Sequence, residues 1–516
     1  MITKPIDREF NVEVESARID PTFLSELINA HSRKIAPKYK KYQRLYENKH
    51  RILNRPKVDE NKPNNRISND FFSQIIDNTV GYFLGNPIIF NYTEPKAEKK
   101  PIEVDPVDVG VDLSGMEDTR VQDELDKILS DNDKDDLFIE WGKEAMVKGL
   151  SHLLVYQNEE SKSKFMRVSP EDCIIVYKNS STHEAKWKIR LYDIDTEDTK
   201  KTTHYAEVYD NTGYDIFTCV EDGSGVRGTR AVSHYTFSKR VPHIYGRMPV
   251  ITLYNNEEQM SDLERIETLV SDYDKVLSDM SNEFEAFRNA YLMLKNMVAG
   301  KDALEKLKVE GILEIMENGD AKFLTKQIQT DAIENHLDRL ERNIYKFSQV
   351  PDLSDENFAN NLSGIAIRFK LFGLETKCII KERKMEKAIK ELFRVLYAPL
   401  RVLTGREPDV INLKIEFTRN VPNNITEVVD TVCKLEGKVD RETLLSLLPF
   451  VDNPKEILEK LENDAEADSA KRDPYSDMNI DRDMSVVFPN LNGSGASQSG
   501  FNNQVGESIS NGTQNG

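Results

Sequence analysis

The chain has 516 residues, of which 31% are charged and 38% hydrophobic, and its formal net charge at pH 7 is −19. This length allows large cores and more than one lobe. No stretch approaches the ~18 uncharged apolar residues of a membrane span, and the mixed-charge start argues against a secretory signal, so we expect a cytoplasmic protein. The acidic balance argues against a main task of gripping nucleic acid, which requires neutralised phosphates. A surface that repels phosphates still suits the sliding of DNA past it.

The amino-terminal region is locally basic. Residues 31–57 carry ten Lys or Arg side chains and one acidic side chain, and Tyr39, Tyr42 and Tyr46 recur within them at helical spacing. One interpretation is a nucleic-acid patch in which aromatic side chains alternate with cations. The interpretation we favour is an amphipathic surface helix whose tyrosines face the core.

Further helices are predicted before residue 151. Ser68 or Asn69 can cap a helix with an apolar face. Gly85 ends this helix, because glycine suits a left-handed cap and the proline two residues later cannot continue a helix. The polar residues 93–118 predict an exposed loop, and residues 121–150 are predicted to be helical.

Residues 151–255 change to short β-prone runs. Six such runs, HLLVYQ, KFMRV, CIIVYK, KWKIRLYDI, HYAEVYD and DIFTCVE, are separated by turn formers such as residues 211–213 and 222–225. We therefore predict an antiparallel β-rich lobe.

Two long helices with narrow apolar stripes are predicted next. From Asn255 the stripe advances by three or four positions over about 30 residues, or about 45 Å of helix, and the remaining surface is mostly acidic. This stripe consists of Met260, Leu263, Ile266, Val270, Tyr273, Leu277, Met280, Phe284 and Phe287. The second stripe consists of Ile333, Leu337, Leu340, Ile344 and Phe347. Between the helices, residues 312–325 predict a hairpin with Asn318 and Gly319 at its turn.

A polar segment and a very long helix follow. Pro351 ends the second striped helix, and residues 350–364 are rich in turn formers. From Ser363 to about Leu403 a helix is predicted, with Gly373 as a candidate kink. The run INLKIEF that follows it predicts a strand.

The carboxyl-terminal part has two characters. Residues 424–465 predict short helices. Residues 466–516 are rich in Asn, Ser, Gly and Gln and contain few large apolar side chains. Such a segment cannot bury enough surface to offset its ordering entropy, so we predict a disordered tail.

The usual motifs of catalysis are absent. The sequence has no GxxxxGK[ST], HExxH or GxSxG, and its eight histidines show no metal-ligand spacing. The four cysteines form no CxxC and favour reduced, mostly buried thiols. The run DNDKDD suggests a magnesium site, although acidic runs between helices are usually solvated loops. We predict no enzyme, no metal and no cofactor. The alternative is a metal-dependent nuclease that uses Asp131, Asp133, Asp135 and Asp136.

Several stretches form an ordered set of motifs along the chain. The first is YQRLYENKHRILNRP with NNRISNDFFSQIIDNTVGYFLGNPIIFNY, which contains a tyrosine pair and a Gly-Tyr-x-x-Gly-x-Pro motif. This stretch resembles the amino-terminal signature of portal proteins of long-tailed phages of Gram-positive bacteria. Asn48 stands where the family commonly has glycine, and asparagine is the next-best residue for a left-handed turn. The further matching stretches are residues 169–177, 245–287 and 361–375 and the basic helix that follows, so the resemblance covers roughly residues 39–420.

The resemblance implies an α+β portal-type fold that assembles as a ring, usually a dodecamer. It implies a wing at 1–255, stem helices at 256–287 and 329–349, a clip at 288–328, a tunnel loop at 350–364, a long wing helix and strand at 365–422, a crown at 423–465 and the tail at 466–516. The narrow stripes support a stem independently, because a stem helix in a ring buries one side against its neighbours and turns another to the channel. The alternative is an ordinary hairpin within one subunit.

The resemblance also implies a virion protein that forms the channel for packaging and ejecting double-stranded DNA at one capsid vertex. The implied partners are other copies of the chain, the terminase large subunit, the head–tail adaptor, and the major capsid and scaffolding proteins, with no membrane. A role in nucleating procapsid assembly is implied as well. An adaptor or scaffold protein of a phage is the structural alternative.

Three groups of site residues are expected. The tunnel-loop residues expected at the DNA channel are Asp352, Ser354, Asn357, Asn360, Asn361 and Ser363. The three asparagines and Ser363 can contact phosphates without anchoring them. The channel-facing stem acids are Glu264, Glu267, Asp274 and Asp279. The clip residues for terminase docking are Glu314, Glu317, Asn318, Asp320 and Lys322.

Overall fold

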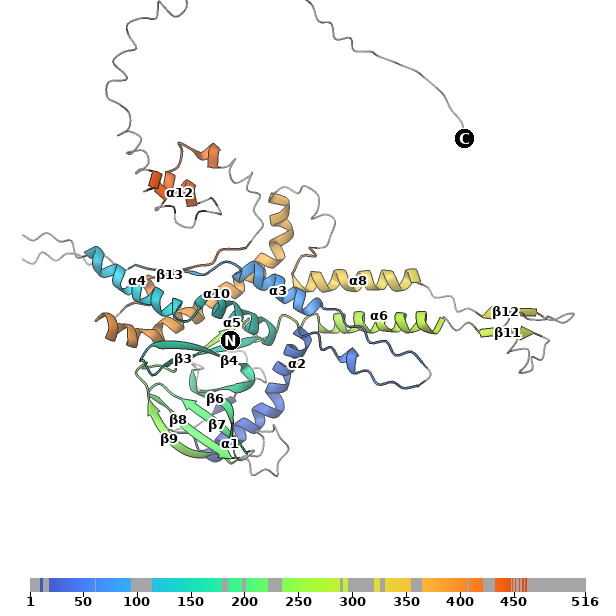
Figure 1. Cartoon of the computed structure of the whole chain (residues 1–516), viewed down its shortest axis with the longest axis horizontal. Coiled ribbons are helices and arrows are strands. Elements are labelled where there is room, and N and C mark those ends of the chain that lie inside the picture. The colour runs from blue at the N-terminus through green and yellow to red at the C-terminus, as the bar shows by residue number, and fades with distance from the viewer. Residues whose placement is uncertain are drawn as a thin grey trace, which may run out of the picture. The chain divides into compact units, whose positions relative to one another are not determined.

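In the computed structural model the chain divides into two compact units, Met1–Val421 and Pro422–Gly516. The described residues are 10–12, 18–60, 62–93, 114–178, 184–196, 201–220, 234–287, 291–295, 320–324, 330–353, 364–405, 408–420 and parts of 432–461. In the second unit, α12 (Arg441–Ser446) begins after Asp440, whose carboxylate accepts a hydrogen bond from the Thr443 amide at 2.9 Å. The predicted tail lies outside the described residues. All other elements below belong to the first unit (Figure 1).

The amino-terminal helices confirm the favoured interpretation of the tyrosines. α1 (Pro21–Ala30) and α2 (Ala36–Tyr46) are joined by one π-helical turn, η1 (His31–Ile35). Tyr39 and Tyr42 are buried, so the tyrosine side of α2 faces the core. After α2 the chain turns through Asn48, whose φ of 55° is left-handed as predicted.

The ends of α3 (Phe71–Leu84) differ from the prediction in their chemistry. Neither Ser68 nor Asn69 caps the helix; Asn69 donates instead to the Asp274 carboxylate at 2.9 Å. The helix ends before Gly85 as predicted, but Gly85 has φ −66°, so a left-handed cap is wrong. Glycine is required for close approach, because an added Cβ would lie 2.2 Å from the Gly81 carbonyl oxygen.

The helical prediction for residues 121–150 is confirmed, and the region forms two helices, α4 (Ser114–Ser130) and α5 (Lys134–Lys148). The chain breaks between them at a turn in which Asp133 has the left-handed φ of 47°. Gly149, with φ 96°, ends α5. Most of the predicted loop at 93–118 lies outside the described residues.

The β-rich lobe is confirmed and contains two sheets. The six-stranded sheet has the order β1-β5-β6-β7-β8-β9, and the three-stranded sheet has the order β10-β3-β4. Their bounds are β1 (Phe10–Val12), β5 (Cys173–Lys178), β6 (Ala185–Thr196), β7 (Lys201–Tyr209), β8 (Gly213–Val220), β9 (Thr236–Pro242), β10 (Val250–Tyr254), β3 (Leu150–Gln157) and β4 (Ser163–Val168). β1 is parallel to β5, and the other pairs are antiparallel. Leu24 and Ile28 of α1 share a core with Trp187 of the larger sheet.

The longest helix crosses the main core. α10 (Gly364–Thr404) has the predicted extent, and Figure 1 shows it bending near its start. Ile389 of α10 is buried in one cluster with Phe72 of α3, Trp141 of α5 and Ile251 of β10. β13 (Leu413–Glu416), the predicted strand, pairs antiparallel with β2 (Ile89–Tyr92).

Two antiparallel helices, α6 (Glu267–Phe287) and α8 (Thr330–Ser348), project side by side from the rest of the unit (Figure 1). The prediction that the first helix begins near Asn255 is wrong. The Asn256 side chain accepts a hydrogen bond from the Met260 amide at 2.8 Å, and Gln259 is left-handed with φ 55°, so the chain turns here.

The second half of the predicted hairpin is a strand, but it pairs with residues that precede the hairpin in the sequence. β12 (Asp320–Leu324) pairs antiparallel with β11 (Tyr291–Lys295). The first half of the predicted hairpin, residues 312–319, lies outside the described residues. The mixed helices and sheets confirm the α+β class, whereas the boundaries of wing, stem, clip and crown stay predictions.

Candidate functional site

The apolar stripe of α6 is buried at the base of the helix pair and exposed toward its far end. Ile266 and Val270 are completely buried, whereas Phe284 is 45% exposed. Leu340 and Ile344 of α8 are buried at the same base. The pair therefore packs as a hairpin within one subunit near the body, and leaves apolar surface uncovered farther out.

Aromatic side chains fix the base of both helices to α3. The ring of Phe71 lies 5.1 Å from that of Tyr273 on α6 and 6.1 Å from that of Tyr345 on α8, both edge to face. Phe347 does not join this core. Its side chain is 49% exposed, so the prediction that it continues the buried stripe of α8 is wrong. Its position on the helix directs the side chain away from α6.

An extended segment, residues 64–70, runs along α6 (Figure 1). Backbone amides at alternate positions of this segment donate to α6 side chains spaced four residues apart. The three bonds join Asn65 to Asn282 Oδ1 (2.6 Å), Ile67 to Ser278 Oγ (3.0 Å) and Asn69 to Asp274 Oδ1 (2.9 Å). Two extended residues advance about 6.6 Å and four helical residues about 6.0 Å, so the two repeats stay in step. We call this set of bonds the amide ladder.

Asp274 is the most enclosed member of the ladder. Its other carboxylate oxygen lies 2.5 Å from Nδ1 of His50, and the two side chains are only 2% and 3% exposed. The acid therefore has partners on two segments, and it fixes the turn after α2 and the start of α3 to α6.

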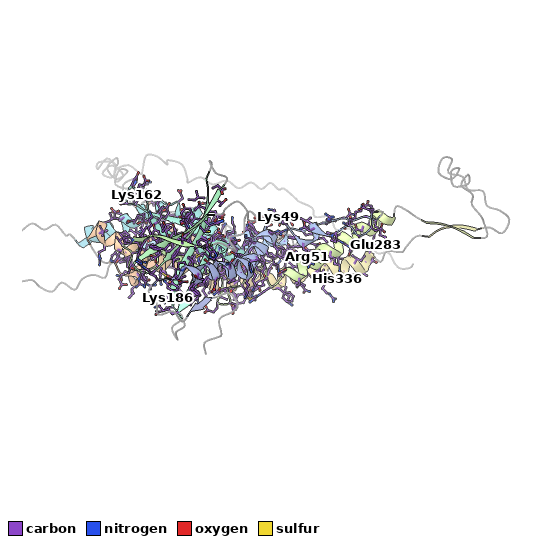
Figure 2. The ribbon with its side chains drawn as sticks, turned by 90° about the horizontal axis from the view of Figure 1, so that it is seen from below. Lys49, Arg51, Lys162, Lys186, Glu283 and His336 are labelled. Atoms are coloured by element: carbon purple, nitrogen blue, oxygen red, sulfur yellow. The ribbon has the colours of Figure 1, made fainter. Side chains whose placement is uncertain are left out.

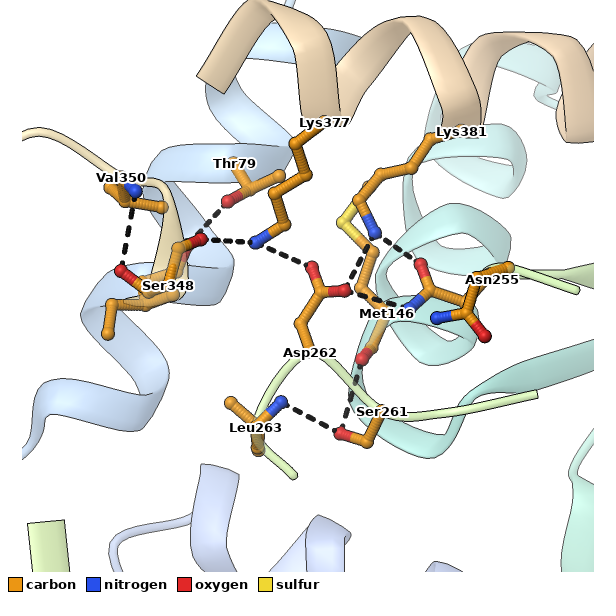
Figure 3. A network of polar contacts seen from close by, with 12 residues as sticks. Thr79, Met146, Asn255, Ser261, Asp262, Leu263, Ser348, Val350, Lys377 and Lys381 are labelled. Carbon is orange, nitrogen blue, oxygen red and sulfur yellow. Dashed lines mark hydrogen bonds and ion pairs between the residues drawn. The ribbon is translucent and has the colours of Figure 1, made fainter. Parts of the chain in front are cut away.

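A second buried network joins the base of α6 to α10 (Figure 3). Asp262 lies 2.9 Å from Nζ of both Lys377 and Lys381, and it accepts a hydrogen bond from Asn255 at 2.8 Å. Lys377 also donates to the Ser348 carbonyl at the end of α8, at 3.2 Å. Burial alone would raise the pKa of Asp262, but the two ammonium groups hold it well below its usual value. The roots of α6, α8 and α10 are therefore tied together by charge.

The four predicted channel acids do not form one exposed face. Asp274 is buried as described, so the prediction that it lines a channel surface is wrong. Glu267 lies 2.6 Å from Nζ of Lys41, and Asp279 lies 2.6 Å from Nη1 of Arg55. Glu264 lies in the turns before α6 and also has a partner. Whether Glu264, Glu267 or Asp279 faces a channel stays a prediction.

The other predicted site residues lie mostly outside the described part. In the tunnel loop, Asp352 is half-buried after α8, while Ser354, Asn357, Asn360, Asn361 and Ser363 lie outside the described residues. In the clip, Asp320 and Lys322 lie on β12, and Glu314, Glu317 and Asn318 are outside. Their roles stay predictions.

The described residues offer no cluster suited to a metal ion. No group of three or more His, Cys, Asp or Glu side chains among them could hold a metal ion, and the run 131–136 lies within this part. Asp135 is paired with Lys134 at 3.0 Å. Cys173 and Cys378 are buried free thiols, and desolvation raises the pKa of each to about 12. Of the helices searched in this part, none is long and apolar enough to cross a membrane.

Comparison with known proteins decides the family. A family model described as "Phage portal protein, SPP1 Gp6-like" matches residues 25–471. The chain belongs to the phage portal protein family. It is 26% identical over 518 residues to the portal protein of Bacillus phage SPP1, with 95% of each chain covered. It is 25% identical over 438 residues to the portal protein of Clostridium phage phiCD119, with 81% of this chain and 90% of the relative covered.

Membership confirms the resemblance read from the sequence motifs. Portal proteins are structural components of phage virions, and they take part in DNA packaging and head–tail connection. The motif run that carried the resemblance, NNRISNDFF, supplies the amide ladder and the start of α3. The motif thus holds one helix of the projecting pair of this portal protein.

Sequence reasoning missed the amide ladder and the Asp262 network. A signal for the ladder was present, because Asp274, Ser278 and Asn282 recur every four residues on one side of the predicted helix. No local pattern links Asp262 to Lys381, which is 119 residues away. Only the fold brings those charges together.

Proposed function

We propose that this portal protein assembles as a ring, usually a dodecamer, around a channel for double-stranded DNA at one capsid vertex. DNA enters through this channel during packaging and leaves through it during ejection. The observation that carries the ring is the stripe of α6, which is covered at the base and exposed at Phe284. Apolar surface on a projecting helix marks a site of contact with another protein. In a symmetric ring, the neighbouring copies of the chain cover this surface.

The test of the ring is electron microscopy of the purified full-length protein with mass measurement of the particles. We expect rings with a central hole. A stable monomer under every assembly condition would contradict the proposal.

The channel is lined largely by acidic and neutral groups, so that repulsion keeps the duplex centred and no deep binding minimum halts it. The net charge of −19 supports this. Asn357, Asn360 and Asn361 of the tunnel loop contact the DNA backbone. If alanine at these three positions and deletion of 354–361 both leave DNA packaging unchanged, the assignment of the loop is wrong.

The clip, residues 288–328, docks the terminase large subunit during packaging and the head–tail adaptor afterwards. The sequence has no phosphate-binding loop for ATP, so the energy comes from a partner. Exchange of residues 312–325 for an unrelated hairpin should abolish stimulation of the terminase ATPase while rings persist. Rings that still stimulate fully would refute this placement.

In the infected cell the ring also nucleates procapsid assembly, through contacts with scaffolding and major capsid proteins. It has no catalytic activity of its own. Incubation of the purified protein with plasmid DNA and Mg²⁺ checks this, and cleavage lost on mutating Asp131, Asp133, Asp135 and Asp136 would favour a nuclease instead.

A further inference from the structure

A basic groove lies beside the base of the helix pair. It has a volume of about 880 Å³ and is bounded by α2, η2 (Arg51–Asn54) and the first half of α6. Lys40, Arg44, Arg51 and Lys275 line it with exposed side chains, and none forms an ion pair with a residue that the structure describes. Figure 2 shows Arg51 at the root of the helix pair. Four unpaired cations in a chain of net charge −19 favour an anionic occupant.

The acids that line the groove already have partners. Glu267 binds Lys41, and Asp274 binds His50 beneath the groove. The carboxylate of Asp272 lies 3.3 Å from Nε2 of His336 on α8. Among the residues that the structure describes, no acid therefore compensates the excess positive charge of the groove.

α8 carries the complementary charge. Asp331, Glu334 and Asp338 are spaced three and four residues apart on one side of α8, are exposed, and form no ion pair with the described residues. Burial, followed by the negative charges of Asp352 and Asp338, raises the pKa of Glu341 on the same side. Arg342 lies one helical turn from Asp338 and donates to its carbonyl oxygen at 3.2 Å, but among the described residues no cation is ion-paired with these three carboxylates.

The groove and the acidic face lie at matching heights but on different sides. The contact of His336 with Asp272, a residue of the groove, places this part of α8 level with the groove. Figure 1 shows α2 and α8 on opposite sides of α6. Subunits of a ring are related by rotation about its axis, and this rotation leaves the position along the axis unchanged. If the helices run along the axis, α8 of the neighbouring subunit therefore lies at the same level as this groove. Two different faces that meet head to tail close a ring.

We propose that the acidic face of α8 in one subunit docks into the basic groove of the next subunit. This inference rests on the proposed ring and names the two surfaces that join it at the base of the helix pair. Glu334 and Asp338 meet Lys40 and Arg44, because both pairs are spaced by one helical turn.

Charge reversal tests the contact. In the full chain, Lys40→Glu with Arg44→Glu, or Glu334→Lys with Asp338→Lys, should lower the fraction of subunits in rings at least about tenfold, which corresponds to 1.4 kcal/mol. All four substitutions in one chain should restore rings. Ring fractions come from electron microscopy and mass measurement, and thermal unfolding checks that each variant folds.

Lys34→Glu with Lys38→Glu is the matched control. It makes the same charge change at the same spacing, at exposed residues that do not line the groove, and rings should persist. Wild-type rings that survive both reversals would overturn the groove contact but leave the proposed function intact. Groove variants that keep rings and lose binding of a short labelled duplex would also overturn it, and would identify DNA phosphates as the occupant. Absence of wild-type rings would instead refute the proposed function.

Discussion

One apolar stripe runs along α6 from the base of the helix pair to its far end, but its side chains are buried at the base and exposed at the far end. At the base, Ile266 is fully buried, and Asp262 and Asp274 are enclosed by partners from other segments. At the far end, Phe284 continues the same stripe but is 45% exposed. The apolar stripe is therefore covered within one subunit at the base, whereas at the far end it is open to contact with neighbours. Substitutions at the two levels should separate folding of the subunit from assembly of the ring.

The largest effect is expected at the charged root. Asp262→Ala leaves Lys377 and Lys381 enclosed without their carboxylate, so the free energy of unfolding should fall by about 3–5 kcal/mol. Denaturant unfolding of the full chain measures it. Asp272→Ala is the control, because its carboxylate is 48% exposed, and it should change stability by less than about 0.5 kcal/mol.

The same root gives a pH dependence. The folded pKa of Asp262 lies below its ordinary 3.8, so the ionised carboxylate stabilises the fold above that pH. This contribution is lost as the pH falls below 3.8 through the folded pKa. The stability difference between wild type and Asp262→Ala should therefore shrink in acid. A difference that grows between pH 5 and pH 3 would show that the charge pairing is not its source.

The second effect contrasts two positions of the α6 stripe. Ile266→Ala should lower the free energy of unfolding by about 2–5 kcal/mol, because it opens a cavity at a fully buried site. Phe284→Ala should cost the isolated subunit much less and should lower the yield of rings instead. Thermal unfolding together with particle counts separates the two. Equal losses of subunit stability would remove the distinction between base and far end.

The third effect concerns the amide ladder. Ser278→Ala removes the acceptor of the Ile67 amide at a fully buried position. The free energy of unfolding should fall by about 1–3 kcal/mol. Hydrogen exchange of the Ile67 amide should speed up more than that of amides in the β-rich lobe. Ser271→Ala on the exposed side of α6 is the control, and the ladder would lose its support if both variants exchanged alike.

The smallest effect is expected at Glu341. Its folded pKa is raised above 4.5, so the fold favours the protonated form, and the stabilising contribution is lost as the pH rises through the folded pKa. Glu341→Gln should stabilise the isolated subunit slightly at pH 7, by no more than about 0.5 kcal/mol because the side chain is partly exposed. Melting curves at pH 7 and pH 4 check this, and the gain should vanish at the lower pH.

The sequence by itself determined the class of fold, the β-rich lobe and the striped helices. The spacing of apolar residues is set by the local sequence. The helices α8 and α10 and the strands β3 to β8 therefore form where this spacing predicted them. The order of weak motifs also identified the family, which the match over residues 25–471 confirms. The buried tyrosines of α2 followed from their helical spacing in the same way.

Only the tertiary structure decided where helices begin and which charges are buried. Asn255 and Asn256 belong to a helical pattern, yet the Asn255 side chain bonds with Asp262 and Lys381, and the Asn256 side chain bonds with the Met260 backbone in the turn before α6. Asparagine is a favourable residue at a helix N-terminus, but the side chain of Asn69 instead donates a hydrogen bond to Asp274, which is 205 residues away in the sequence. Charge and hydrogen-bonding partners at such separations leave no trace in local periodicity, so the acids of α6 could not be divided into buried and exposed ones from sequence alone.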